Sequence, residues 1–226
     1  MQLQIRFLCV NMKPRTVTIV DFGMGNLLSV RNAFEYHDAI VNITSDPKDV
    51  AEAEVIVLPG VGAFPAAMKN LERLNLIDSI KSFASREQPL LAICLGMQLL
   101  MDSSDEFALT NGLGLIPGRV QKIPPTLEKF GEKTPRIGWR EITIPDKQES
   151  WRGSILEECS NESSMYFVHS YRVLPKERQD FLAVSQINEF EVCSAIKRNN
   201  LTGVQFHPEK SGKNGLKLIK SFLKSN

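Results

Sequence analysis

Cys94 has the sequence setting of a catalytic nucleophile. The apolar stretch Pro89–Cys94 is typical of a buried strand, and a helical pattern begins directly behind it at Gly96. A sharp strand-to-helix turn pushes a side chain out above a sheet, and the free N–H groups and dipole of the helix start favour a thiolate and an oxyanion. The alternative is a small buried hydrophobe, the role of most free cysteines. No comparable setting surrounds the remaining cysteines, Cys9, Cys159 and Cys193.

His207 is the best candidate for the base that such a cysteine needs. A free thiol is only a few per cent thiolate at pH 7, so a base or a favourable field must activate it. His207 ends an apolar strand pattern, and Pro208 holds it extended because a residue before proline avoids the α region. Glu209 lies two positions further on, where an extended chain directs side chains to the same side. The order Cys94, His207, Glu209 therefore predicts a catalytic triad.

The two other histidines lack this pattern. His37 ends a polar helical stretch and is predicted to be an exposed surface residue. His169 lies in an apolar strand pattern, which is typical of a satisfied core or edge-strand histidine.

The elements around these residues predict an α/β fold. Buried-strand patterns alternate with helical patterns through the first half of the chain, which favours a parallel sheet covered on both faces. The expected strands there are Thr16–Asp21, Ile40–Thr44, Glu54–Pro59 and Pro89–Cys94, and the expected helices are Gly25–Asp38 and Ala63–Arg86, the latter broken near Asn75. The second half predicts an antiparallel extension of the sheet before a final helix, Gly215–Lys224. Its expected strands are Arg119–Ile123, Glu141–Ile144, Met165–Ser170, Phe181–Ile187, Val192–Lys197 and Leu201–Phe206.

Composition favours a cytoplasmic globular protein. The chain of 226 residues is 42% hydrophobic and 23% charged, as in globular proteins. Its net charge of +1 argues against a nucleic-acid-binding protein, which would be strongly basic. The longest apolar stretch, Pro89–Met101, is too short to span a bilayer, and the N-terminal residues lack a signal-peptide pattern. The spacing of the four cysteines matches neither a disulfide scaffold nor a zinc site, and no metal or cofactor is expected.

The expected domain organisation is a single domain, 16–226, behind an N-terminal extension, 1–15, of uncertain status. The first eleven residues precede Met12 and are either dispensable or a result of start-site choice. The segment Pro124–Pro135 is rich in charge and proline and is predicted to be a mobile loop rather than a domain boundary.

Three separated motifs resemble the class I, or triad, glutamine amidotransferases: LPGVGAF (Leu58–Phe64), AICLGMQLL (Ala92–Leu100) and GVQFHPEKS (Gly203–Ser211). Within that family the chain is more specifically similar to the glutaminase subunits of imidazole glycerol phosphate synthases. DFGMGNLLSV (Asp21–Val30), GLGLIPGRV (Gly112–Val120) and MYFVHSY (Met165–Tyr171) extend this resemblance from Thr16 to the C-terminus.

The resemblance implies a Rossmann-like fold and a glutaminase reaction. Cys94 would attack the side-chain amide of glutamine, His207 would protonate the leaving ammonia, and water would release glutamate. The oxyanion would be held by the N–H of Leu95 and by the strip Gly60, Val61 and Gly62, where glycine allows the backbone to approach the substrate and to flip. The residues expected to bind glutamine are Gln98, Glu106, His169, Ser170 and Tyr171.

The resemblance also implies a heterodimer partner, a (β/α)₈-barrel cyclase that consumes the ammonia and forms imidazole glycerol phosphate and AICAR in histidine biosynthesis. Asn26, Trp139 and Lys210 match positions expected at that interface. Each also has a plain alternative: Asn26 as a helix cap, Trp139 as a core residue and Lys210 as a solvated charge.

Departures from the family pattern leave other functions open. Ala92 replaces a glycine two places before the nucleophile. The strand-to-helix turn at Cys94, called the elbow below, is expected to tolerate this change. Arg136 and Arg140 replace a histidine and an asparagine on the segment expected to meet the partner, and a changed interface charge favours a different partner. One alternative is thus the same glutaminase serving another synthase, such as a nucleotide-sugar amidotransferase in surface polysaccharide synthesis. A stand-alone thiol hydrolase and a non-catalytic binding module are further alternatives.

Overall fold

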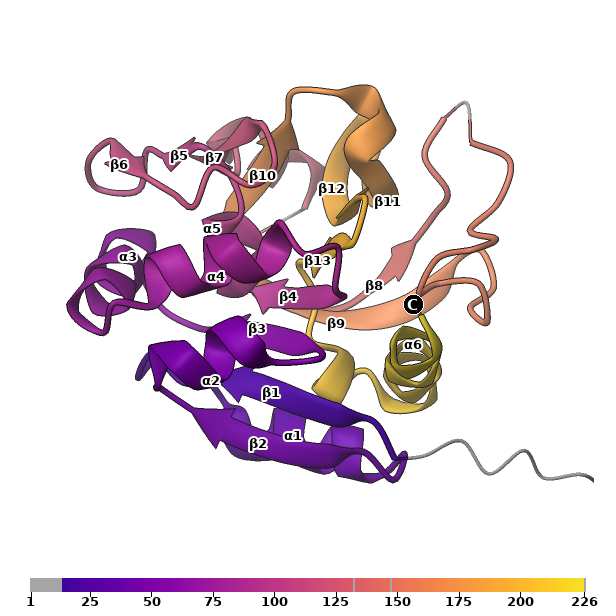
Figure 1. The fold of residues 1–226 in the computed structure, drawn as a ribbon. Helices are drawn as coiled ribbons and strands as arrows, with labels where there is room; N and C mark the ends of the chain where they lie inside the picture. Colours follow the sequence, from indigo (N-terminus) through magenta and orange to yellow (C-terminus); the bar gives the residue numbers. More distant parts are fainter. Residues whose placement is uncertain (1–13, 132, 147, 226) are drawn as a thin grey trace, which may run out of the picture.

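A seven-stranded sheet forms the centre of the protein, which is described here by a computed structural model of residues 14–131, 133–146 and 148–225. In spatial order its strands are β11 (Phe181–Ile187), β12 (Phe190–Arg198), β13 (Leu201–Val204), β4 (Leu90–Cys94), β3 (Ile56–Gly60), β1 (Thr16–Val20) and β2 (Ile40–Thr44). The strands from β13 to β2 run parallel, while β11 and β12 pair antiparallel at one edge (Figure 1). The predicted α/β class, with a mostly parallel sheet and an antiparallel extension, is confirmed. The extension is smaller than predicted, because the expected strands Arg119–Ile123, Glu141–Ile144 and Met165–Ser170 lie in other sheets and β13 pairs parallel with β4.

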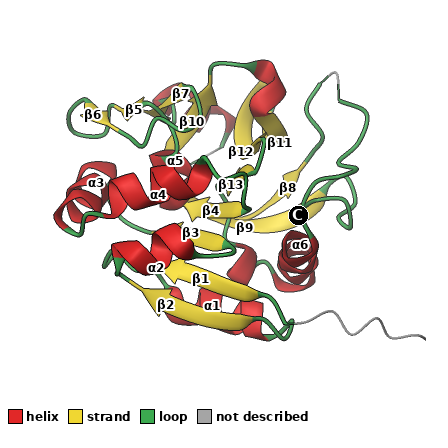
Figure 2. Cartoon of the chain, in the orientation of Figure 1, coloured by secondary structure: helices red, strands yellow, loops and turns green. Residues whose placement is uncertain are grey.

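Helices cover both faces of this sheet (Figure 2). They are α1 (Leu27–Glu35), α2 (Pro47–Glu52), α3 (Phe64–Arg73), α4 (Leu76–Ala84), α5 (Leu95–Leu99) and α6 (Gly212–Lys224). Successive strand residues point to opposite faces. In β3, Val57 accordingly packs in the core formed with α1 and α6, and Leu58 packs in the core formed with α2, α3, α4 and α5. The predicted break in the long helical pattern is confirmed, because Asn75 adopts a left-handed conformation between α3 and α4.

Two smaller sheets flank the central one. A four-stranded sheet has the order β10 (Tyr171–Pro175), β7 (Gly118–Lys122), β5 (Ser103–Ser104) and β6 (Thr110–Asn111). A separate antiparallel ribbon pairs β8 (Arg136–Ile142) with β9 (Ser163–His169).

Sequence patterns missed several short elements. The prediction of a strand at Glu141–Ile144 was wrong in its bounds, because β8 begins five residues earlier, at Arg136. The helix α2 and the strands β5, β6 and β10 were not predicted at all. Pro124–Pro135, predicted to be a loop, contains the 3₁₀ helix η1 (Pro125–Phe130), whose Leu127 packs with Ile123 in a small buried cluster.

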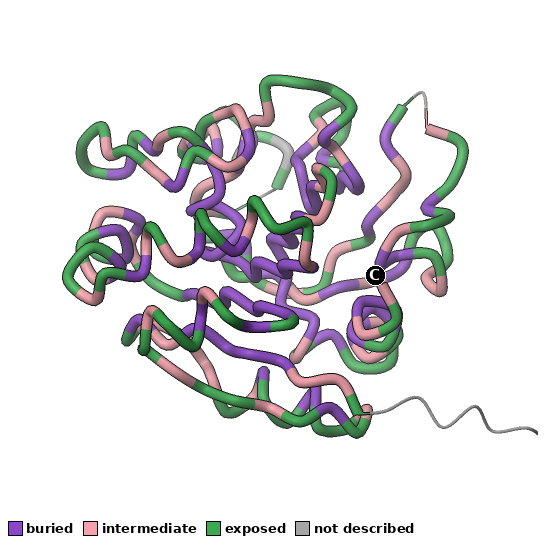
Figure 3. Tube along the Cα trace, viewed as in Figure 1, coloured by how far each residue is buried: buried purple, intermediate pink, exposed green. Residues whose placement is uncertain are grey.

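Burial is concentrated in the central strands, where the trace in Figure 3 is largely purple. β3 and β4 are buried along their whole length, since α2 to α5 cover one face and α1 and α6 the other. Among the described residues, no helix combines the length and apolar character needed to cross a membrane. Residues 1–13 of the predicted extension, Cys9 included, lie outside the described part of the chain.

Candidate active site

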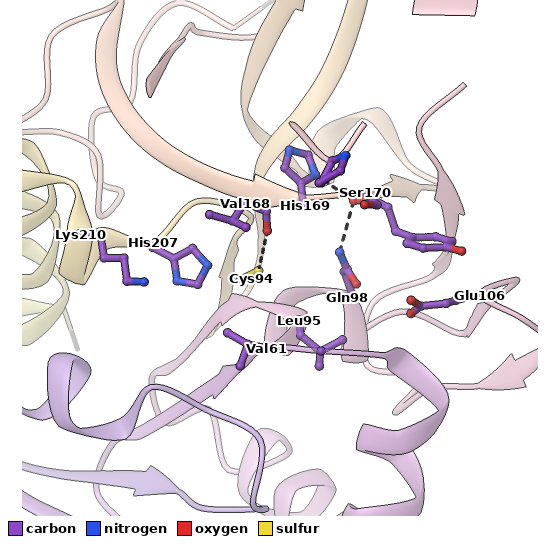
Figure 4. A pocket seen from close by; sticks show the side chains of 13 residues that line it. Val61, Cys94, Leu95, Gln98, Glu106, Val168, His169, Ser170, His207 and Lys210 are labelled. Carbon is purple, nitrogen blue, oxygen red and sulfur yellow. Dashed lines mark hydrogen bonds between the residues drawn. The ribbon is translucent and has the colours of Figure 1, made fainter. Parts of the chain in front are cut away.

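A cavity of about 280 Å³ opens at the carboxyl ends of β3 and β4, beside the start of α5. Cys94 lies near its middle, with His207 and Lys210 on one side and Gln98 and Glu106 on the other (Figure 4). Open parallel sheets bind ligands at this end of their strands. The cavity is lined by Val61, Gly62, Cys94, Leu95, Gln98, Glu106, Pro135, Val168, His169, Ser170, Tyr171, His207 and Lys210.

Cys94 lies on a strained turn between β4 and α5. Its backbone has φ 54° and ψ −109°, a conformation that residues other than glycine rarely adopt. Gly96 allows the turn, because a Cβ atom at this position would lie 1.9 Å from the Leu58 carbonyl oxygen. The elbow forms with Ala92 in place of glycine. Cys94 is only 6% exposed, and its thiol lies 3.8 Å from the Val168 carbonyl oxygen, within reach of a weak S–H hydrogen bond.

His207 connects Cys94 to Glu209. Its Nδ1 atom lies 2.8 Å from Glu209 Oε1, and both side chains are almost fully buried. Burial acts against the charged imidazole, but the interactions with Cys94 and Glu209 outweigh it and raise the pKa of His207 from 6.5 to about 10. The structure thus brings the three predicted triad residues together, and the site favours an imidazolium beside the sulfur.

The raised pKa of His207 gives a direct test of this coupling. In the unaltered protein the ring is expected to stay protonated until the pH approaches about 10. Cys94→Ala removes one of the two partners that raise this pKa, so the midpoint of the His207 titration should fall, as measured by NMR of the imidazole nitrogens. Cys159→Ala is the control and should leave the midpoint unchanged. An unchanged midpoint in Cys94→Ala would show that the cysteine does not interact with His207.

The residues predicted to bind glutamine lie on the far side of Cys94 from His207. Gln98 Nε2 donates to the Tyr171 carbonyl oxygen at 3.3 Å, which fixes the orientation of its amide. Glu106 Oε2 accepts from the Phe64 N–H at 2.7 Å, and its carboxylate borders the cavity (Figure 4). Burial, Glu106 and Asp105 raise the pKa of Tyr171, which indicates a negative environment at this end. A carboxylate here suits the ammonium group of an amino acid.

The remaining predicted members of this set lie at the end of β9 and directly after it. His169 and Ser170 line the cavity wall. His169 is 5% exposed, and its Nδ1 lies 2.9 Å from the Tyr171 carbonyl oxygen. Its ring therefore shares a carbonyl with Gln98, which places it in the wall of the site.

One residue that sequence patterns did not single out also contacts Cys94. Gln205 is fully buried, its Nε2 lies 3.6 Å from Cys94 Sγ, and its Oε1 lies 3.1 Å from Gln98 Nε2. A signal for it exists in the sequence, since it is a polar residue in an apolar strand pattern and lies two positions before His207.

The predicted oxyanion strip is only partly available in this conformation. Leu95 begins α5, so its N–H belongs to the first turn, which has no carbonyl partner within the helix. The Val61 N–H, in contrast, donates to the Met24 carbonyl oxygen at 3.1 Å. Gly62 follows with φ 106°, where glycine is favoured. The strip must change conformation before the Val61 N–H can reach an oxyanion in the cavity.

The other described cysteines differ clearly from Cys94. Burial raises the pKa of Cys159 to about 11, and burial raises the pKa of the enclosed Cys193 thiol still further. Both thiols are therefore poor nucleophiles at neutral pH.

The prediction that His37 is an exposed surface residue was wrong in part: the ring is half-buried, and its Nε2 lies 2.8 Å from the Leu216 carbonyl oxygen on α6.

Two of the three predicted interface residues lack the plain roles that were the alternatives. Trp139 is 52% exposed and packs edge-on against Tyr166, so it is not a core residue. Asn26 stands at the start of α1, but its side chain makes no capping hydrogen bond. Lys210 is exposed, which agrees with its alternative as a solvated charge, and it also lines the cavity.

The expected change of interface charge at Arg136 was wrong. Arg136 is 1% exposed, and its guanidinium donates to Ser185 Oγ at 2.7 Å and packs over the Phe167 ring. Alternation along β8 turns this side chain inward, so it cannot alter the charge of a partner surface.

Within the described ranges, no cluster of three or more His, Cys, Asp or Glu side chains is arranged to hold a metal ion.

Comparisons with known proteins agree with this geometry. The model of the family "Glutamine amidotransferase class-I" matches residues 18–225. The chain is 45% identical over 209 residues to the imidazole glycerol phosphate synthase subunit HisH 1 of Legionella pneumophila (strain Lens), covering 92% of this chain and 98% of that protein. It is 41% identical over 208 residues to the subunit HisH of Moorella thermoacetica, covering 92% and 94%. Among solved structures, PurLQS from Thermotoga maritima matches with a TM-score of 0.71 at 17% identity, over 94% of this chain and 99% of that one, which shows likeness of fold.

Proposed function

Because the chain belongs to the class I glutamine amidotransferase family, we propose that it is the glutaminase subunit of an imidazole glycerol phosphate synthase. It hydrolyses glutamine at Cys94 and delivers ammonia to a (β/α)₈-barrel cyclase subunit. The observation that carries this proposal is the buried Cys94–His207–Glu209 arrangement at one cavity, in a chain whose relatives are subunits of that synthase. We further propose that residues 16–226 form one catalytic domain and that the protein acts in the cytoplasm.

The triad geometry supports covalent catalysis. The Cys94 sulfur attacks the side-chain amide carbon of glutamine, and the imidazolium of His207 gives its proton to the leaving nitrogen, which departs as ammonia. His207 then takes a proton from water, whose oxygen displaces Cys94 from the thioester and gives glutamate. Glu209 holds the ring through Nδ1 and stabilises its positive charge. The raised pKa of His207 keeps the proton available for the leaving group at neutral pH.

The polarity of the cavity orients the substrate. Glu106 supplies a negative charge for the α-ammonium group at one end, while Cys94 and His207 lie at the other (Figure 4). Gln98 donates both described Nε2 hydrogen bonds to protein acceptors, so its Oε1 is the part of the amide left for the ligand. An amino acid with a side-chain amide therefore spans from Glu106 to Cys94.

An exposed apolar surface beside the cavity supports a protein partner. Ile137, Trp139, Tyr166 and Val168 share one face of the β8–β9 ribbon, because Ile137 pairs with Val168 and Trp139 with Tyr166. Ile137 is 53% exposed, Trp139 52% and Val168 37%. Val168 also lines the cavity, and the Tyr166 carbonyl accepts from the His207 N–H. This surface, together with Lys210, would place a bound subunit at the mouth from which ammonia leaves.

We expect the isolated chain to have low glutaminase activity that the cyclase subunit strongly increases. The physical reason is the hydrogen bond from the Val61 N–H to Met24, which removes one oxyanion donor from the cavity. Since one such donor is worth about 10²–10³ in kcat, partner and nucleotide ligand together should stimulate at least about 100-fold. Glutamate release would be measured for the chain alone, with the cyclase subunit from the same source, and with that subunit and its nucleotide ligand.

The outcomes of this experiment separate the alternatives. Strong stimulation by both together supports the glutaminase, the partner and the pathway. Weak glutaminase activity without stimulation would retain the chemistry and assign the chain to another synthase. High activity in isolation, equal to that of the complex, would contradict the inactive state of the oxyanion strip and favour a stand-alone hydrolase.

A further inference from the structure

The buried amide of Gln205 lies between the nucleophile and the glutamine-binding side chain. Its Nε2 is 3.6 Å from Cys94 Sγ, and its Oε1 is 3.1 Å from Gln98 Nε2. The residue has no solvent exposure, so both contacts lie in a dry environment in which hydrogen bonds to charges are strong.

The hydrogen-bond network fixes which end of the Gln205 amide faces the sulfur. The Tyr171 carbonyl oxygen can only accept, so the Gln98 atom that lies 3.3 Å from it must be the nitrogen. That nitrogen also faces Gln205 at 3.1 Å, which requires the Gln205 oxygen there. The Nε2 of Gln205 therefore points at Cys94, and a main-chain carbonyl anchors the orientation of both amides.

We propose that Gln205 is a positioning residue of the nucleophile: it donates a hydrogen bond to the Cys94 thiolate and couples that thiolate to Gln98. The inference deepens the proposed glutaminase function and rests on it for its role in turnover. In the resting enzyme the N–H donor stabilises the anionic sulfur alongside His207. When the sulfur attacks, its negative charge passes to the substrate oxygen, and the donor holds the sulfur in line with the amide carbon.

Gln205 and His207 hold the sulfur from the short segment that follows β13. The two residues lie two positions apart, and the Gln205 N–H is bonded to the Ser194 carbonyl oxygen while the His207 N–H is bonded to the Tyr166 carbonyl oxygen. Both anchors come from strands, so rigid backbone holds the two side chains in contact with Cys94. One residue supplies the proton and the other a neutral donor that does not compete for it.

The test is the pH profile of Cys94 alkylation by iodoacetamide, followed by mass spectrometry of the Cys94 peptide in the full-length chain. Gln205→Met keeps the length of the side chain and removes the donor. The pH of half-maximal alkylation is expected to rise by about one unit, the equivalent of one hydrogen bond to an anion. Gln205→Glu places a carboxylate beside the sulfur and should raise the pH of half-maximal alkylation further.

Neither variant changes the other titratable groups that face this cavity or the triad. These groups are His207, Glu209, Lys210, His169, Tyr171 and Glu106.

Turnover gives a second readout. In Gln205→Met, kcat for glutamine hydrolysis is expected to fall about tenfold, and KM should rise because Gln98 loses one of its two acceptors. Ser194→Ala is the matched control: its hydroxyl is equally buried and bonds to Ser185, but it does not contact Cys94. This variant is expected to lower the unfolding free energy without moving the alkylation midpoint.

An alkylation midpoint that both Gln205 variants share with the unaltered protein would overturn the proposal. Because alkylation requires neither glutamine nor a partner, this result is independent of the proposed function. If the unaltered protein releases no glutamate, the glutaminase proposal fails, while the alkylation profiles still decide the role of Gln205. If one variant does not fold, the profile of the other gives the answer.

Discussion

Cys94→Ala is expected to abolish glutamate release while leaving the fold and partner binding intact. No other described cysteine can replace it, since burial raises the pKa of Cys159 to about 11 and that of the enclosed Cys193 thiol further. Removal of a triad nucleophile commonly costs more than about 10⁴ in kcat. The change deletes one sulfur atom at the elbow and leaves Trp139 and the rest of the β8–β9 surface unchanged. Glutamate release and binding to the cyclase subunit would be measured on the same preparation.

Cys159→Ala is the control for this prediction. Its thiol lies outside the cavity, near the Asn214 carbonyl oxygen on α6, so the variant should retain glutaminase activity. Measurable glutamine hydrolysis by Cys94→Ala would rule out Cys94 as the nucleophile. Loss of partner binding in the same variant would show that the elbow also shapes the interface.

The parts of the site that sequence patterns predicted are those that depend on neighbours along the chain. The strand-to-helix turn at Cys94 requires only an apolar run followed by a helical pattern with Gly96. The relation of His207 to Glu209 was predicted from an extended pair two residues apart. Pro208 does follow an extended His207, but Glu209 lies in the 3₁₀ helix η3 (Pro208–Lys210), so the two side chains meet across a short turn. The turn at Cys94 forms as predicted, and both features depend on residues close along the chain.

The features that were missed depend on contacts between distant segments. Gln205 touches Cys94 across 111 residues of sequence, and nothing near it predicts that partner. The hydrogen bond from the Val61 N–H to Met24 links two loops through main-chain atoms, which leave no trace in residue types. Arg136 was placed at the partner surface because the resemblance implies that its segment meets the partner, yet alternation along β8 buries it beside Ser185 and Phe167. Charge is a poor guide to exposure where a buried hydroxyl and an aromatic face compensate.

Gly96→Ala is expected to be the most destabilising single substitution at the elbow. The new methyl group would lie 1.9 Å from the Leu58 carbonyl oxygen and 3.0 Å from its carbon, and both are main-chain atoms of the central strand β3. Since these atoms cannot rotate away, α5 would have to move off the sheet. We expect a loss of more than about 4 kcal/mol in the free energy of unfolding, or no soluble protein. Denaturant unfolding would measure it.

Gly153→Ala separates this steric effect from the general cost of replacing glycine. Gly153 has φ 73°, and no atom lies within 4 Å of the place where the new methyl group would stand, so its variant should lose only about 1–2 kcal/mol through left-handed backbone strain. Any Gly96→Ala protein that folds should also lose kcat, because moving α5 carries the Leu95 N–H away from the oxyanion position. A Gly96 variant within about 1 kcal/mol of the unaltered protein would contradict the close contact between α5 and β3. The position of Cys94 would then depend only on the turn at the end of β4, and not on the packing of α5 against β3.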